Sequence, residues 1–210
     1  SIGVGINYSD WQTNLSFNFF DPYFSPDGVG LGYGAYLRSS DYSNFNISAY
    51  NTESFGGSVQ FVLPINEISQ LSLSVALDQT DLQSDFLSSR QLLDFIASEG
   101  SKFETLTLGA SWSRNSLNRG LFPTAGTLNV ISASVAIPGS SLTYGRLSHR
   151  FKYFRPLSNN FIFSIRTELG GLFAYGDTET APPYENFYAG GLNSVRGFEQ
   201  NSLGPRAVYD

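Results

Sequence analysis

Apolar and small polar side chains alternate with a period of two along much of the chain. The stretch 103–113, FETLTLGASWS, shows this most regularly. Its apolar positions are Leu106, Leu108, Ala110 and Trp112. The stretches 71–78 and 11–19 follow the same rule, with leucine, valine or aromatic side chains opposite mostly serine, asparagine or glutamine. Because successive side chains of a β-strand point to opposite faces, the pattern predicts strands with one apolar face.

Weaker alternation occurs in further stretches of similar length, which brings the number of predicted strands to about nine. These stretches are 1–8, 28–38, 55–63, 128–137, 143–154 and 161–173. Most have the roughly 9 to 11 residues that a tilted strand needs to cross a membrane. One helix is predicted at 88–100, where four apolar side chains share a face and Gly100 ends the pattern. The fold class is therefore all-β.

The connections between these strands alternate between short and long. Proline, glycine and asparagine mark short turns at 21–28, 64–67, 119–126 and 155–160. Longer connections are expected at 39–53, at 79–101 and beyond residue 175. Short turns at one rim and long loops at the other are typical of antiparallel β-barrels of the bacterial outer membrane.

A soluble β-sandwich also alternates, and it is the competing interpretation. The polar face here consists mainly of small uncharged side chains, which suits the lumen of a transmembrane barrel better than an exposed sandwich face. Aromatic residues at strand ends favour an interfacial girdle; they are Tyr8, Trp11, Tyr23, Phe24 and Trp112. An odd number of strands does not close a single-chain bacterial barrel, so we expect residues 1–210 to be a partial transmembrane barrel domain of a longer protein.

Composition excludes several classes of function. The chain has no cysteine, so it holds neither a disulfide nor a thiolate metal site. Its net charge of -6 argues against nucleic-acid binding, which needs a basic face. The single histidine, His149, lies in phase with Leu147 and Phe151, and no paired carboxylates or phosphate-binding loop stand out. We therefore expect no enzyme activity, no cofactor and no metal.

Charged residues concentrate in two of the predicted strands. In 143–154 the cations share a phase opposite to Leu147 and Phe151, and in 161–169 an arginine and a glutamate oppose the apolar positions. These residues are Arg146, Arg150, Lys152, Arg166 and Glu168. In a barrel they would form a locally basic wall of the lumen, whereas a solvated strand face is the simpler alternative.

The last long connection has a different composition, rich in glycine and aromatic residues. It runs PYENFYAGGLNSVRGFEQNSLGPRAV over 183–208. Its glycines permit positive φ and close backbone approach, and Phe187, Tyr188 and Phe198 can anchor it in a lumen. Arg196 would then need an acidic partner, because a buried unpaired guanidinium is costly. A mobile surface loop with an incidental arginine is the alternative.

This segment also carries a resemblance to a known family. YENFYAGG, VRGF and the following GP resemble loop six of the BamA family of outer-membrane protein insertases, within the superfamily of POTRA-containing outer-membrane barrel proteins. The resemblance extends over the whole chain, through DPYFSPDGVGLG at 21–32, VLPINEI at 62–68, NRGLFPTAG at 118–126 and VAIPGS at 135–140.

The resemblance implies a sixteen-stranded barrel, of which this chain would hold strands three to eleven. Residues 176–207 would be extracellular loop six, folded into the lumen, and the periplasmic POTRA domains would be absent. The family's loop arginine corresponds to Arg196, and its acidic partners would lie on strands beyond Asp210. The residues of the implied latch are Gly190, Gly191, Val195, Arg196, Gly197 and Phe198.

The function implied is folding and insertion of β-barrel proteins into the bacterial outer membrane. The implied partners are accessory outer-membrane lipoproteins, unfolded outer-membrane protein clients, lipid and lipopolysaccharide, with no nucleic acid and no cofactor. A polypeptide-secretion transporter or passive pore of the same superfamily, with loop six as its plug, is the alternative function.

Overall fold

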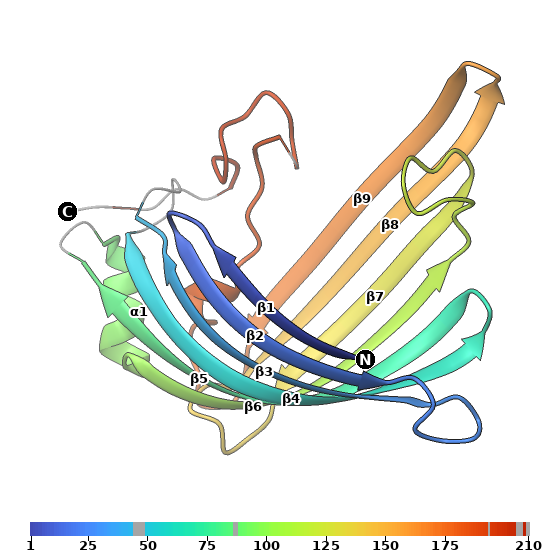
Figure 1. Ribbon diagram of the computed structural model, residues 1–210. Coiled ribbons are helices and arrows are strands. Elements are labelled where there is room, and N and C mark those ends of the chain that lie inside the picture. Colours follow the sequence, from blue (N-terminus) through green and yellow to red (C-terminus); the bar gives the residue numbers. More distant parts are fainter. Residues whose placement is uncertain (44–48, 86–87, 193, 205–207, 209–210) are drawn as a thin grey trace.

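The computed structural model describes residues 1–43, 49–85, 88–192, 194–204 and 208. In these residues nine strands form a single antiparallel sheet in which each strand pairs with its neighbours in sequence (Figure 1). The strands are β1 (Ile2–Tyr8), β2 (Gln12–Asp21), β3 (Gly30–Asp41), β4 (Tyr50–Asn66), β5 (Ser69–Ser84), β6 (Lys102–Asn115), β7 (Gly126–Ala136), β8 (Tyr144–Ser158) and β9 (Phe161–Ala174). The predicted all-β, antiparallel fold class is confirmed.

The sheet curls into an open trough, with β1 and β9 as its two free edges (Figure 1). A right-handed strand twist rolls any long antiparallel sheet in this way, and a barrel results when the edges meet. Within the described residues β1 and β9 do not pair with each other. The trough is therefore a partial, unclosed barrel.

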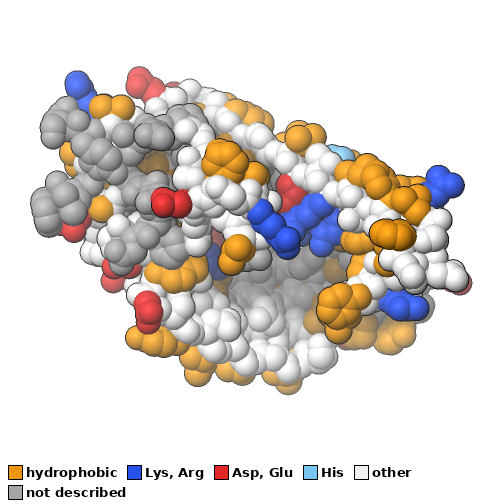
Figure 2. Space-filling view, turned by 90° about the horizontal axis from the view of Figure 1, so that it is seen from above, with side chains coloured by type: hydrophobic (Ala, Val, Ile, Leu, Met, Phe, Trp, Pro, Cys, Tyr) orange, Lys and Arg blue, Asp and Glu red, His pale blue; other side chains and the backbone are white. Residues whose placement is uncertain are grey.

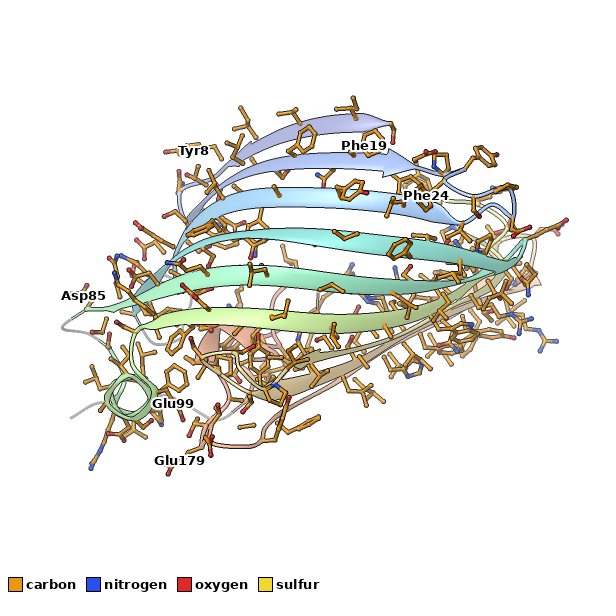
Figure 3. All side chains as sticks on the ribbon, turned by 90° about the horizontal axis from the view of Figure 1, so that it is seen from below. Tyr8, Phe19, Phe24, Asp85, Glu99 and Glu179 are labelled. Carbon is orange, nitrogen blue, oxygen red and sulfur yellow. The ribbon has the colours of Figure 1, made fainter. Side chains whose placement is uncertain are left out.

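Cross-strand register sorts side chains onto the two faces of the trough. Val75 of β5 lies opposite Leu108 of β6, which lies opposite Val135 of β7. These side chains are on the convex face, where apolar residues are exposed along every strand (Figure 3). One position further along, Ser74 lies opposite Gly109 on the concave face. The period-two pattern of the sequence thus separates an apolar outer surface from a polar inner one.

Several strands are longer than the hydrophobic pattern indicated. The connection expected at 39–53 is shorter, because β3 continues to Asp41 and β4 already begins at Tyr50. Polar residues pair there as well as apolar ones, for example Ser40 with Thr52. The connection expected at 79–101 likewise begins only after Ser84. Backbone hydrogen bonds extend a strand beyond the segment that has an apolar face. The hydrophobic pattern therefore locates the apolar middle of each strand better than its ends.

A small enclosed core closes one end of the trough. The helix α1 (Arg90–Glu99) begins after Ser89, whose hydroxyl accepts a hydrogen bond from Leu92 N, and ends at Gly100. Its buried side chains Leu92 and Phe95 pack in a cluster with residues from the ends of five strands and the β7–β8 connection. The other members of that cluster are Tyr50, Leu82, Phe103, Ala136, Leu142 and Tyr144. No helix in the described ranges is both long and apolar enough to cross a membrane.

Candidate functional site: the concave wall and the loop after β9

The five charged residues predicted in 143–154 and 161–169 lie on the concave face of β8 and β9. Register places Arg150 of β8 opposite Glu168 of β9, and Lys152 opposite Arg166. Arg146 lies further along β8, opposite Ser134 of β7. Figure 2 shows the cationic side chains gathered around an acidic one within the hollow. We call these five residues the basic wall.

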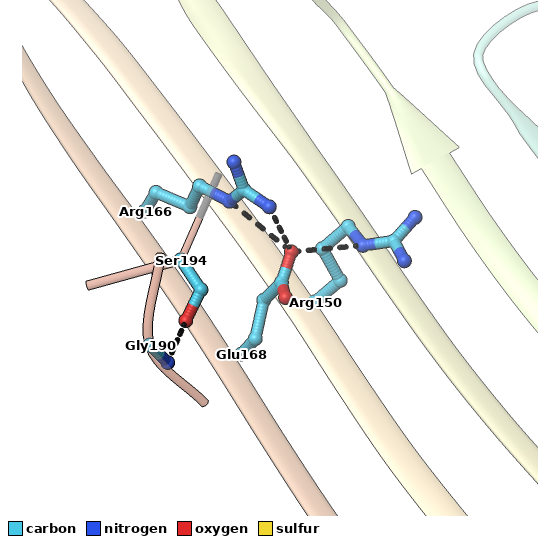
Figure 4. Close-up of polar contacts among 5 residues, drawn as sticks. All are labelled: Arg150, Arg166, Glu168, Gly190 and Ser194. Carbon is cyan, nitrogen blue, oxygen red and sulfur yellow. Dashed lines mark hydrogen bonds and ion pairs between the residues drawn. The ribbon is translucent and has the colours of Figure 1, made fainter. Parts of the chain in front are cut away.

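One carboxylate, that of Glu168, contacts two cations of the basic wall, Arg150 and Arg166. Glu168 Oε1 accepts from Arg166 Nη2 at 2.7 Å and Nε at 3.1 Å, and it lies 3.3 Å from Arg150 Nε (Figure 4). All three side chains are about half exposed, so each pair contributes little to stability, of order 0–1 kcal/mol. With Lys152 nearby, positive charge exceeds negative charge on this patch, which can therefore attract anionic groups.

The segment after β9 folds back toward the concave face (Figure 1). We call residues 175–204, without residue 193, the post-β9 loop; residues 205–207 of the predicted loop six lie outside the described residues. The loop is tied first to the rim that carries α1. Thr143 N donates to Thr178 Oγ1 at 2.8 Å, and Glu179 N donates to Glu99 Oε1 of α1 at 2.9 Å (Figure 3). A short 3-10 helix, Pro183–Glu185, follows.

Glu185 brings the loop into contact with the basic wall. Its Oε2 lies 3.7 Å from Arg146 Nε, and both side chains are about one third exposed. The ring of Phe187 lies over the same guanidinium, with 4.5 Å between Arg146 Cζ and the ring centroid. Burial raises the pKa of Glu185, and the Arg146 charge offsets only part of that effect. The loop and the wall therefore share one partly desolvated ion pair covered by an aromatic ring.

Tyr184 joins the loop to the enclosed core. Its ring lies 6.4 Å from that of Phe103, centroid to centroid, and its side chain packs against the core cluster. Burial raises the pKa of its phenol. Tyr184 and Glu185 are adjacent in sequence, and one contacts the core while the other contacts the wall. The first half of the loop, 175–188, is thus seated on two different parts of the trough.

The second half of the loop, 189–204 without residue 193, closes on itself. Ala189 bridges to Leu203, and Gly191 N donates to Phe198 O at 3.0 Å. Gly190, Gly191 and Gly197 have φ values of 112°, 94° and 91°, a region that disfavours any side chain. At Gly190 an added Cβ would lie 2.3 Å from a backbone oxygen. These glycines, predicted as part of a latch, let the chain double back tightly.

Arg196 and its neighbours lie at the exposed part of this second half. The side chains of Val195, Arg196 and Phe198 are exposed. Within the described residues the structure gives Arg196 no ion pair with a carboxylate. An acidic partner for Arg196 stays a prediction.

Sequence reasoning identified Arg146 and Phe187 but overlooked Glu185. The available signal was a single acidic residue inside the aromatic run PYENFY, in a segment expected to enter a lumen with basic side chains.

His149 lies on the convex face, beside Ile131 in register, and its Nε2 is 2.9 Å from Asn129 Oδ1. Among the described residues no group of three or more His, Cys, Asp or Glu side chains is arranged to hold a metal ion.

Comparison with known proteins agrees with this architecture. The model of the Omp85 superfamily domain matches residues 1–210. The outer membrane protein assembly factor BamA of Neisseria meningitidis serogroup B is 35% identical over 220 residues, which cover 100% of this chain and 28% of that protein. BamA of Nitratidesulfovibrio vulgaris is 21% identical over 201 residues, covering 95% of this chain and 24% of that protein.

A solved structure shares the same fold. The crystal structure of BamA from Haemophilus ducreyi lacking POTRA domains 1–3 matches with a TM-score of 0.92 and 28% identity, over 99% of this chain and 42% of that one. The chain therefore spans about a quarter of the length of the curated relatives it matches.

Proposed function

Because the chain belongs to the Omp85 superfamily, we propose that the protein that carries it folds and inserts β-barrel proteins into the bacterial outer membrane. The observation that supports this most strongly is the match of the whole chain, at 35% identity, to a protein named as an outer membrane assembly factor. The apolar convex face, continuous over nine strands, fits a location in that membrane.

In this proposal the chain supplies one side of the barrel and the loop that occupies its lumen. The basic wall and the post-β9 loop would fix the shape of the lumen, and Arg196 would complete the latch with an acidic residue elsewhere in the protein. Client strands would pair with an exposed barrel edge, using its unsatisfied backbone groups as a template. Because the work is strand pairing and membrane insertion, the protein would need no covalent catalysis, nucleotide or cofactor.

The partners of such a protein follow from its task. Unfolded outer-membrane proteins would be its clients, and accessory outer-membrane lipoproteins would deliver or hold them. The apolar convex face would contact lipid and lipopolysaccharide. With a net charge of -6, the chain offers no general attraction to nucleic acid.

Depletion of the full-length protein from its native cell, followed by quantitative proteomics of the outer membrane, tests the proposal. We expect many unrelated barrel proteins to fall together while their unfolded forms accumulate in the periplasm. Re-expression of the wild-type protein in the same cells is the control and should restore them. Loss of one secreted protein with the other barrels intact would overturn the proposal in favour of a dedicated transporter, with the post-β9 loop as its plug.

A further inference from the structure

We propose that Glu185, Phe187 and Arg146, with Gly170 beneath them, form an anchor that positions the first half of the post-β9 loop on the lumen wall independently of Arg196. This inference rests on the proposed role of the segment as a lumen loop. We call these four residues the loop anchor. They come from three places in the sequence: the loop itself, β8 and β9.

The ion pair and the ring meet at the same guanidinium. Arg146 lies 3.7 Å from the Glu185 carboxylate and 4.5 Å from the centroid of the Phe187 ring. A carboxylate at the guanidinium edge and an aromatic ring over its face use two separate surfaces of one side chain. Together they define both the position and the direction of the loop, which a single contact does not.

Gly170 gives the Phe187 ring its seat on β9. A Cβ added at Gly170 would lie only 2.6 Å from Phe187 Cε1 and 2.7 Å from both Cδ1 and Cζ. The ring therefore rests directly against the backbone of the wall, in a space that any side chain at position 170 would occupy. Gly171 is the adjacent residue, and a Cβ added there would meet nothing within 4 Å. The absence of a side chain matters to the anchor at one of these two glycines only.

The ion pair and the aromatic ring contribute differently to the anchor: one to the orientation of the loop, the other to the free energy that holds it. Burial raises the pKa of Glu185 and the Arg146 charge offsets only part of that rise, so desolvation of the carboxylate counteracts the attraction within the pair. The pair therefore orients the loop, while burial of Phe187 and Tyr184 supplies the favourable free energy. Reversing the charge of either partner would still be costly, because two like charges would then face each other in a partly desolvated place.

Distance measurement between spin labels tests the anchor in the full-length protein. Labels are placed at Asn186→Cys in the loop and Asn160→Cys in the β8–β9 turn, with any other cysteine of the protein replaced by serine. Gly170→Val is compared with the matched control Gly171→Val. We expect Gly170→Val to shift and broaden the distance distribution, and Gly171→Val to retain the wild-type distribution. A wild-type distribution in Gly170→Val would overturn the proposal.

Charge reversal provides a second arm that does not depend on steric effects. Glu185→Arg and Arg146→Glu should each displace the loop. The double variant should move the distance back toward that of the wild type, because the pair is re-formed with opposite polarity while the contact of the Arg146 guanidinium with the Phe187 ring is not. A double variant no closer to wild type than the two single variants would also contradict the anchor. Both arms read a distance and not client assembly, so a failure of the proposed function would leave their outcome interpretable.

Discussion

Tyr36 of β3 donates a hydrogen bond of 2.5 Å to Asp78 of β5, passing over Gly56 of the strand between them. The register places the three residues in one row on the concave face. A Cβ at Gly56 would lie 2.2 Å from Asp78 Oδ1 and 2.9 Å from Tyr36 Cε1. A glycine in the middle strand is thus what lets side chains of the two outer strands reach each other.

Gly56→Ala should therefore destabilise the barrel by removing this bond. Loss of a hydrogen bond to a charged group, with local strain added, costs about 1–3 kcal/mol. Gly57→Ala is the matched control, because its Cβ would be on the other face with its nearest neighbour at an ordinary 3.6 Å. Urea unfolding in lipid vesicles measures both. Equal unfolding midpoints for the two variants would show that the bond contributes nothing.

The fold was predictable because the alternation of apolar and small polar residues within a strand indicates which side chains lie on each face of the sheet. Alternation at 103–113 predicted β6 (Lys102–Asn115) closely, since lipid-facing Leu106 and Leu108 must alternate with small lumen residues. The ends of β3 and β4 were not predictable in this way. At these ends buried polar pairs such as Ser40 with Thr52 continue the ladder, and they leave no hydrophobic pattern in the sequence.

The strand phase of the basic wall was predictable from the sequence, whereas the role of Glu185 and the pairings of these side chains were not. The phase of Arg146 placed it opposite the apolar positions, yet nothing local to β8 indicates that Glu185 would reach it. That contact depends on the path of the loop. The packing of Tyr184 against Phe103 and the tight turns at the positive-φ glycines that follow determine this path. Such long-range packing has no period in the sequence.

The polar pair on the convex face gives a prediction about stability. His149 Nε2 lies 2.9 Å from Asn129 Oδ1 among apolar neighbours. His149→Leu should leave the Asn129 amide unsatisfied at a lipid-facing position and cost about 1 kcal/mol. Asn129→Val combined with His149→Leu should recover most of that loss, since neither partner then remains unpaired. A double-mutant cycle on unfolding free energies measures this, and a single His149→Leu variant as stable as wild type would contradict it.

Arg196→Ala separates stability from proposed function. The side chain is exposed and has no ion pair within the described residues, so we expect unfolding free energy to change by no more than about 0.5 kcal/mol. If Arg196 completes the latch, the variant should nevertheless slow client insertion into reconstituted vesicles and make the loop more sensitive to protease. Arg119→Ala, in the exposed β6–β7 connection, is the control. An unchanged rate of client insertion together with unchanged protease resistance of the loop would contradict the assignment of Arg196 to a latch.

Acidification should strengthen the seating of the post-β9 loop. Burial raises the pKa of Glu185 above its ordinary value near 4.5; Asp78 adds to the rise, and Arg146 and Arg38 oppose it. The Glu185 carboxyl therefore binds its proton more tightly in the seated loop than in a released loop, where Glu185 lies in water. Seating is then strongest below the ordinary value and weakens as the pH rises from there through the raised pKa.

The same pair of spin labels, at positions 186 and 160, measures the seated population as the pH is lowered from neutral. We expect the narrow seated distance to gain population, and Glu185→Gln to remove the contribution of this carboxyl to the pH dependence. A seated population that falls on acidification would show the opposite balance, with the attraction of Arg146 exceeding the cost of desolvation. In that case the ion pair, and not the burial of Phe187 and Tyr184, would be the main source of free energy that holds the loop on the wall.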